Sequence, residues 1–139
     1  ESWVSEALEA GAECLVGGSR VGAFYAPTVL INVPKGQKVR DEEVFGPVVM
    51  IESFASIDYA IQEVNDCRWG LQSSIFTDSI EVRNKVFNQL NVGSVIHNKS
   101  TTFRVDDMPY GGVKDSGFGR EGVKYAMLDF LEPKLLVRE

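Results

Sequence analysis

The chain has 139 residues, 44% of them hydrophobic, and its fourteen Lys and Arg stand against twenty Asp and Glu, which leaves a formal charge of −6. This size and hydrophobic content predict a globular protein of one domain. The scattered, net acidic charge argues against a nucleic-acid partner, which needs clustered Lys and Arg. No apolar run approaches the roughly 18 residues of a membrane span, so no membrane partner is expected.

The sequence begins with Glu1 rather than Met and carries no secretory signal at its start, so we expect it to be part of a longer protein. Its two cysteines, Cys14 and Cys67, are too few for a disulfide scaffold and lack the spacing of a zinc site. This favours a reducing, cytoplasmic location and predicts that both are packing residues. The single His97 has no Cys or second His nearby, so we expect a strand residue and no metal site.

The first predicted helix carries apolar residues at helical spacing from Val4 to Leu15 and ends at the glycines 17 and 18. Residues 23–33 are expected to be extended. Residues 48–54 form an almost continuous apolar run, which is typical of a strand buried on both faces. Ser56 is then the expected N-cap of a helix that closes near Gly70.

The alternation of strand and helix continues beyond Gly70. Residues 73–77 predict a strand, Asp78 and Glu81 predict a capping box for a helix that runs to about Leu90, and residues 93–98 predict the next strand. A helix over 122–131 and a strand over 134–138 complete the predicted elements. This order predicts an α/β fold with a mostly parallel sheet, flanking helices and right-handed crossovers.

Residues 98–119 break this rhythm, because they have no period and include five Gly or Pro residues. The stretch leaves the carboxyl end of a predicted parallel strand, where open α/β sheets bind ligands, and loops this long are usually functional or disordered. It is too aromatic for a disordered linker, so we interpret it as a wall of a binding site. The letters GFGREG of residues 117–122 match a dinucleotide fingerprint, but no strand directly precedes them, so we interpret the match as fortuitous.

The segment EEVFGPV of residues 42–48 allows two interpretations. It is either a strand entry with two solvated acids, a turn Gly and a Pro, or part of a binding site. A carboxylate at Glu43 accepts two hydrogen bonds from a vicinal diol such as ribose, and the aromatic Phe45 would lie on the same side of an extended chain, against a flat ring. The residues alone leave both interpretations open.

The runs DEEVFGPVV, VNDCRWGLQSSIFT, GSVIHN and MPYGGVKDSGFGREG, in this order and spacing, resemble the carboxyl-terminal part of the aldehyde dehydrogenase superfamily. The resemblance extends from about Gly11 to Val137 and looks like the branch that handles small polar aldehydes, such as lactaldehyde or glyceraldehyde phosphate. It implies that residues 1–131 are part of a catalytic domain that oxidises an aldehyde to the acid with NAD or NADP. Residues 132–139 resemble the strand that pairs with another subunit of a dimer or tetramer.

In that family a cysteine thiolate attacks the aldehyde carbonyl, hydride passes to the nicotinamide, and a water activated by a glutamate hydrolyses the thioester. By resemblance, Glu43 matches the glutamate that holds the nicotinamide ribose, and Phe45 matches the aromatic beside the nicotinamide. Tyr110 takes the place of the commoner Phe in the turn near cofactor and substrate. Glu121 matches an acid of the inner water path, which makes it the catalytic candidate of this chain.

Residues 100–108 correspond by resemblance to the variable wall of the aldehyde tunnel, with Phe103 and Arg104 as substrate-binding candidates. The Arg104 guanidinium could pair with a carboxylate or phosphate of the substrate. In the alternative interpretation it pairs at the surface with Asp106 or Asp107.

The sequence also departs from the family pattern. No residue matches the nucleophilic cysteine, which we expect upstream together with the general-base glutamate and the dinucleotide-binding domain. Cys67 falls at a helix end away from the chemistry, and Cys14 at a packing position. We therefore expect this chain alone to be inactive towards aldehydes; the alternative is a non-catalytic binding or assembly module on the same scaffold.

Overall fold

The computed structural model describes residues 1–139, which is the whole chain. Its helices and strands fall into two compact units, residues 1–55 and residues 56–139, called here unit 1 and unit 2. Both units combine helices with β-sheet, so the predicted α/β class is confirmed. None of the helices has the length and apolar character needed to cross a bilayer.

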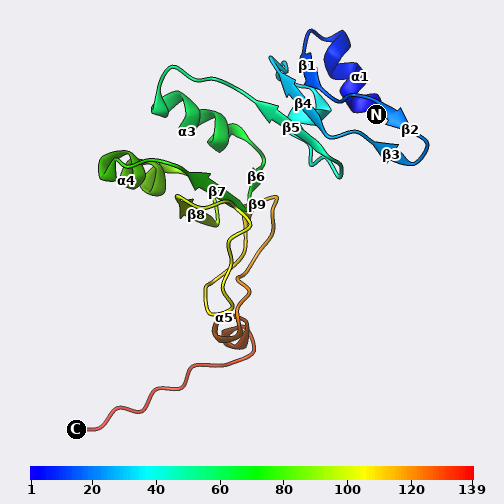
Figure 1. The fold of residues 1–139 in the computed structure, drawn as a ribbon. Helices are drawn as coiled ribbons and strands as arrows, with labels where there is room; N and C mark the ends of the chain where they lie inside the picture. The colour runs from blue at the N-terminus through cyan, green and yellow to red at the C-terminus, as the bar shows by residue number, and fades with distance from the viewer. The chain divides into compact units, whose positions relative to one another are not determined.

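Unit 1 is built on a three-stranded sheet (Figure 1). Its elements in chain order are α1 (Ser2–Glu9), β1 (Glu13–Val16), β2 (Arg20–Val21), β3 (Phe24–Tyr25), β4 (Thr28–Ile31), α2 (Lys38–Asp41) and β5 (Val48–Ile51). The sheet order is β1-β4-β5, with β1 antiparallel and β5 parallel to β4. The short helix α2, which the sequence analysis did not predict, lies in the crossover between the two parallel strands.

The core of unit 1 lies between its two helices and one face of the sheet. Val4 and Ala7 of α1, Leu30 of β4 and Val39 of α2 belong to one buried cluster, in which Leu30 is 0% exposed. Complete burial of such a side chain stabilises the fold by about 1.5–3 kcal/mol. The other face of β5 is open, since alternate residues of this strand are exposed. The prediction that the strand is buried on both faces is therefore wrong for this chain, because helices of the unit cover one face only.

The first helix ends earlier than its apolar spacing predicts. Gly11 adopts a φ of 107°, and the amides of Gly11 and Ala12 donate to the carbonyls of Leu8 and Ala7 at 3.1 and 2.9 Å. This is the Schellman arrangement, in which a glycine in a left-handed conformation ends the helix. The chain then turns into β1, so Leu15 belongs to a strand, because pairing with β4 overrides the helical spacing.

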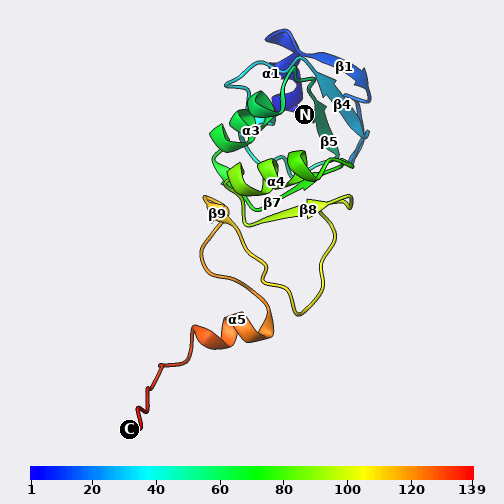
Figure 2. The same cartoon turned by 90° about the vertical axis from the view of Figure 1, so that its left-hand side faces the viewer.

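Unit 2 contains two helices that lie beside a pair of parallel strands (Figure 2). Its elements are α3 (Ile57–Asp66), β6 (Trp69–Gly70), β7 (Gln72–Ile75), α4 (Ile80–Gln89), β8 (Ser94–His97), β9 (Val113–Lys114) and α5 (Val123–Leu128). The strands β7 and β8 pair in parallel, and α4 connects them, so β7-α4-β8 is the expected βαβ unit. The antiparallel pair β6–β9 brings the end of the long loop back to this region.

Two of the three helices of unit 2, α3 and α4, begin at serine caps. Ser56 Oγ accepts a hydrogen bond of 3.2 Å from the Tyr59 amide, which confirms the predicted cap of α3. The cap of α4 is Ser79, whose Oγ accepts from the Val82 amide at 3.2 Å, and not Asp78 as predicted. Both residue types suit this position, so local sequence places the helix start only to within a residue.

The end of the chain differs from the prediction, because residues 131–139 form neither helix nor strand. Leu135, Leu136 and Val137 remain 74–86% exposed. A strand is completed by hydrogen bonds to a neighbouring strand, and residues 134–138 pair with none in this single chain. The structure thus leaves an apolar segment with free backbone groups at the carboxyl end of the chain.

Candidate functional site

Glu43 and Phe45 lie on an extended segment between α2 and β5. Val44, between them, packs against the core of unit 1, whereas Glu43 and Phe45 are both exposed, Phe45 by 94%. This is the alternation of an extended chain, in which residues two apart share a side. The Glu43 carboxylate makes no hydrogen bond or ion pair with the rest of the chain, so the segment presents a carboxylate acceptor and an aromatic ring to the surroundings.

Short backbone hydrogen bonds hold this segment against the sheet. The Gly46 amide donates to the Val44 carbonyl at 2.9 Å, and the Thr28 amide donates to the Pro47 carbonyl at 2.8 Å. The first contact closes a three-residue turn centred on Phe45, and the second ties the entry of β5 to the start of β4. The positions of Glu43 and Phe45 are therefore set by main-chain contacts on both sides of Gly46.

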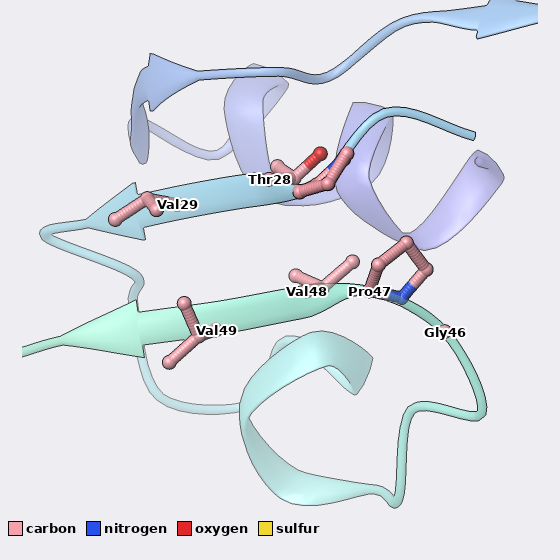
Figure 3. A pocket seen from close by; sticks show the side chains of 7 residues that line it. Thr28, Val29, Gly46, Pro47, Val48 and Val49 are labelled. Atoms are coloured by element: carbon pink, nitrogen blue, oxygen red, sulfur yellow. The ribbon is translucent and has the colours of Figure 1, made fainter.

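An open pocket of about 320 Å³ lies where β4 and β5 begin. Figure 3 shows Thr28 at the start of β4 and Val48 at the start of β5, which are partners in the parallel pairing, with Pro47 directly before β5. The Thr28 hydroxyl donates to the Ala26 carbonyl and accepts from the Gly18 amide, both at 2.8 Å, so the polar side chain of the wall is already satisfied. The pocket offers apolar surface and no catalytic group.

In unit 2 the long loop closes on itself through the main chain. Tyr110 and Glu121 form an antiparallel bridge, in which the Tyr110 amide donates to the Glu121 carbonyl at 3.2 Å and the Glu121 amide donates to the Tyr110 carbonyl at 2.6 Å. Two predicted site residues, eleven positions apart in sequence, are thus held side by side by backbone hydrogen bonds.

Arg104 joins this pair. Its Nη2 lies 2.9 Å from Oε2 of Glu121, and its guanidinium carbon lies 4.3 Å from the centre of the Tyr110 ring. The alternative pairing with Asp106 or Asp107 is wrong, because the bridge at Tyr110 brings Glu121 within reach. Arg104 and Glu121 are both well exposed, so their ion pair contributes about 0–1 kcal/mol. One of the five N–H donors of the guanidinium is used by Glu121, which leaves donors for a second anion.

Phe103 is half-buried and lies beneath a cation that sequence reasoning missed. The Lys99 Nζ lies 4.1 Å from the centre of the Phe103 ring, a cation–π contact. The side chain of Gln72, on β7, donates to the Thr101 and Phe103 carbonyls at 2.6 and 3.4 Å, which fixes this part of the loop. The signal in the sequence that could have indicated this contact was a Lys and a Phe four residues apart, in the loop that begins after β8.

Close backbone packing fixes the turn that follows Tyr110. A Cβ atom on Gly93 would overlap the Gly111 carbonyl oxygen, and one on Gly111 would lie 2.6 Å from the Gly119 carbonyl oxygen. The turn therefore lies between the start of β8 and the Gly119 backbone, with room for glycine only. Gly93 is a positioning residue that the sequence reasoning missed, although a glycine at a strand start often marks such an approach.

The other singled-out residues make no site. His97 lies on β8, as predicted, with Nε2 2.9 Å from the Thr77 carbonyl oxygen. Cys67 is the C-cap residue of α3, as expected for a helix end. The prediction that Cys14 is a buried packing residue is wrong, because β1 is an edge strand with four exposed residues. No cluster of His, Cys, Asp or Glu could hold a metal ion.

Comparison with known proteins identifies the family of this chain. The model of the aldehyde dehydrogenase family matches residues 1–136. The 3-sulfolactaldehyde dehydrogenase of Priestia aryabhattai is 47% identical over 137 residues, which cover 99% of this chain and 29% of that protein. The chain thus spans about 29% of the length of the curated relatives it matches first.

Two solved structures share the fold. Aldehyde dehydrogenase 21 from Physcomitrella patens, in complex with the reaction product succinate, has a TM-score of 0.93 and 49% identity over 99% of this chain and 28% of its own. The glyceraldehyde-3-phosphate dehydrogenase GapN from Methanocaldococcus jannaschii, complexed with NADP, has a TM-score of 0.82 and 41% identity over 91% of this chain and 27% of its own. By sequence and by fold, therefore, the chain belongs to the aldehyde dehydrogenase family and corresponds to less than a third of a full-length member.

Proposed function

We propose that the chain is the carboxyl-terminal part of an NAD(P)-dependent aldehyde dehydrogenase that oxidises an aldehyde to the carboxylic acid. The observation that carries this proposal is the exposed pair of Glu43 and Phe45, an acceptor without a partner and a free ring on the same side of one extended segment. The alternative, in which residues 42–48 only lead into a strand, is the weaker interpretation, since a strand entry needs neither an acid at position 43 nor an aromatic ring at position 45.

The exposed pair fits a dinucleotide cofactor. A carboxylate accepts two hydrogen bonds from a vicinal diol, so Glu43 would hold the nicotinamide ribose, and Phe45 would lie against the nicotinamide ring. Tyr110, held by its bridge to Glu121, is proposed as a cofactor-binding residue of unit 2 from its match to the family's turn near cofactor and substrate. The nicotinamide, when bound, supplies the acceptor for the hydride of the aldehyde.

The rest of the catalytic machinery is proposed to lie outside these residues. The nucleophilic cysteine, the general-base glutamate and the dinucleotide-binding domain would belong to the remaining part of a full-length member. Neither Cys14 nor Cys67 has a base hydrogen-bonded to its thiol: Cys14 Sγ donates to the Val16 carbonyl at 3.2 Å, and Cys67 is the C-cap of α3. Glu121 would serve the proton path of the enzyme, with Arg104 as its charge partner.

Arg104 and Phe103 would select the substrate. The names of the similar proteins include a sulfolactaldehyde, the product succinate and glyceraldehyde 3-phosphate, each of which carries an anionic group. The unused N–H donors of Arg104 suit a carboxylate, sulfonate or phosphate, while the Phe103 ring would line the apolar part of the tunnel. We therefore propose a small anionic aldehyde as the substrate.

The first test compares the full-length protein with the 139-residue chain. The full-length protein should reduce NAD⁺ or NADP⁺ in the presence of succinate semialdehyde, measured by nicotinamide absorbance, whereas the chain alone should not, because it lacks a nucleophile. A full-length protein that binds neither cofactor nor aldehyde would support the alternative, a non-catalytic assembly module. Steady turnover by the chain alone would show that its own residues suffice.

The second test changes one atom of the cofactor site. In the full-length enzyme, Glu43→Gln should lower kcat/KM for the cofactor by about 10- to 100-fold, because hydrogen bonds to a charged acceptor are replaced by weaker ones. Glu9→Gln, on the exposed side of α1, is the matched control and should behave as wild type. Unchanged cofactor affinity and turnover in the Glu43 variant would remove this residue from the site.

The third test concerns anion recognition. Arg104→Leu should lower kcat/KM about 10- to 100-fold more for succinate semialdehyde than for neutral propionaldehyde, since only the anion loses a charge-assisted hydrogen bond. Arg83→Leu, whose guanidinium contacts the Asn84 side chain on α4, controls for the loss of one positive charge. Equal losses for both aldehydes would exclude recognition of the anion by Arg104.

Assembly is proposed to use residues 132–139, in a homo-oligomer that is a dimer or tetramer in the cytoplasm. The exposed Leu135, Leu136 and Val137, with unpaired backbone groups, suit addition to a sheet edge of another subunit. Truncation after Leu131 should therefore reduce the mass of the full-length protein in sedimentation to that of a smaller species. An unchanged mass would place the interface elsewhere.

A further inference from the structure

Residues 111–119, which follow Tyr110, form a turn that is called here the glycine turn. The Arg120 side chain contacts both ends of this turn. Its Nη1 donates to the Gly112 carbonyl at 2.9 Å and to the Gly119 carbonyl at 2.7 Å. Its guanidinium forms no ion pair, so the charge is directed at backbone oxygens alone. We propose that Arg120 is a positioning residue that holds Tyr110 and Glu121 in place through this turn, an inference that rests on the proposed function of the site.

The stem of Arg120 also supports the turn sterically. A Cβ atom on Gly111 would lie 3.1 Å from Cδ of Arg120 and 3.4 Å from its Cα, so the Gly111 backbone rests directly on this side chain. On the other side, Gly93 packs against the Gly111 carbonyl. The turn is thus held between a strand start and one arginine, and removal of the arginine opens one side only.

The bridge transmits this constraint to the site residues. Gly112 follows Tyr110 by two positions, and Gly119 precedes Glu121 by two, so Arg120 joins the two arms of the loop that the Tyr110–Glu121 bridge closes. The two carbonyls lose their donor without Arg120, and Tyr110 loses the fixed turn that follows it. Arg104, which stacks on Tyr110 and pairs with Glu121, depends on the same geometry.

The test is a double-mutant cycle in the full-length enzyme. Arg120→Ala should lower kcat/KM by about 10- to 100-fold, the effect of a small displacement of an oriented group. In the background of Tyr110→Ala the same change should cost less than about threefold, because residues that act as a unit are not additive. Arg120→Lys, which keeps the charge and one donor, should recover part of the loss, and Arg83→Ala should be neutral.

Several outcomes would overturn the inference. If the losses in kcat/KM multiply in the double variant, Arg120 acts independently of Tyr110. If Arg120→Ala has wild-type kinetics, the turn does not need Arg120 to hold its position. If Arg120→Ala fails to fold, the cycle is run with Arg120→Lys, where multiplicative losses count equally against the inference. A wild-type enzyme without NAD(P)-dependent turnover would refute the proposed function. That result is distinguishable from a failure of the inference about Arg120, which is seen only in the variants.

Discussion

The close contact between backbone segments around Gly111 is the constraint on which the unit 2 site depends. Glycines at 93 and 111 let main chains approach to distances that any side chain would prevent, and the Tyr110–Glu121 bridge then closes the loop. A loop of more than twenty residues with little regular structure would otherwise lose considerable conformational entropy on ordering. In this loop the order is maintained by backbone hydrogen bonds, by the Arg120 side chain, and by the close backbone packing that glycine allows at positions 93 and 111.

In unit 1 the candidate site residues are oriented by the packing of one side chain, and not by close contact between backbones. An extended segment sends Val44 into the core and leaves its two neighbours, Glu43 and Phe45, on the open side. The burial of one residue therefore fixes the direction of two others. In unit 1 the two candidate side chains are exposed and a partly buried neighbour orients them, whereas in unit 2 main-chain hydrogen bonds hold Tyr110 and Glu121, and Arg104 adds side-chain contacts to both.

The electrostatics of the long loop differ from those of the whole chain. The protein carries a formal charge of −6, yet Lys99, directly before the predicted substrate wall, and Arg104, within it, place two cations in a span of six residues. Both lie over aromatic rings, Lys99 on Phe103 and Arg104 on Tyr110, and contacts of this kind orient a cation without neutralising it. Glu121 pairs with Arg104 and neutralises part of its charge.

The sequence by itself determined the features that depend on neighbours a few residues apart. The period of α3 and α4, the cap at Ser56, the family motifs and the shared side of Glu43 and Phe45 follow from spacing alone. Only the tertiary structure decided the switch from helix to strand after Gly11, the pairing of Arg104 with Glu121 and the packing of Gly93 on Gly111. These contacts join residues that sequence spacing does not relate, so their energies arise only when the chain has folded back on itself.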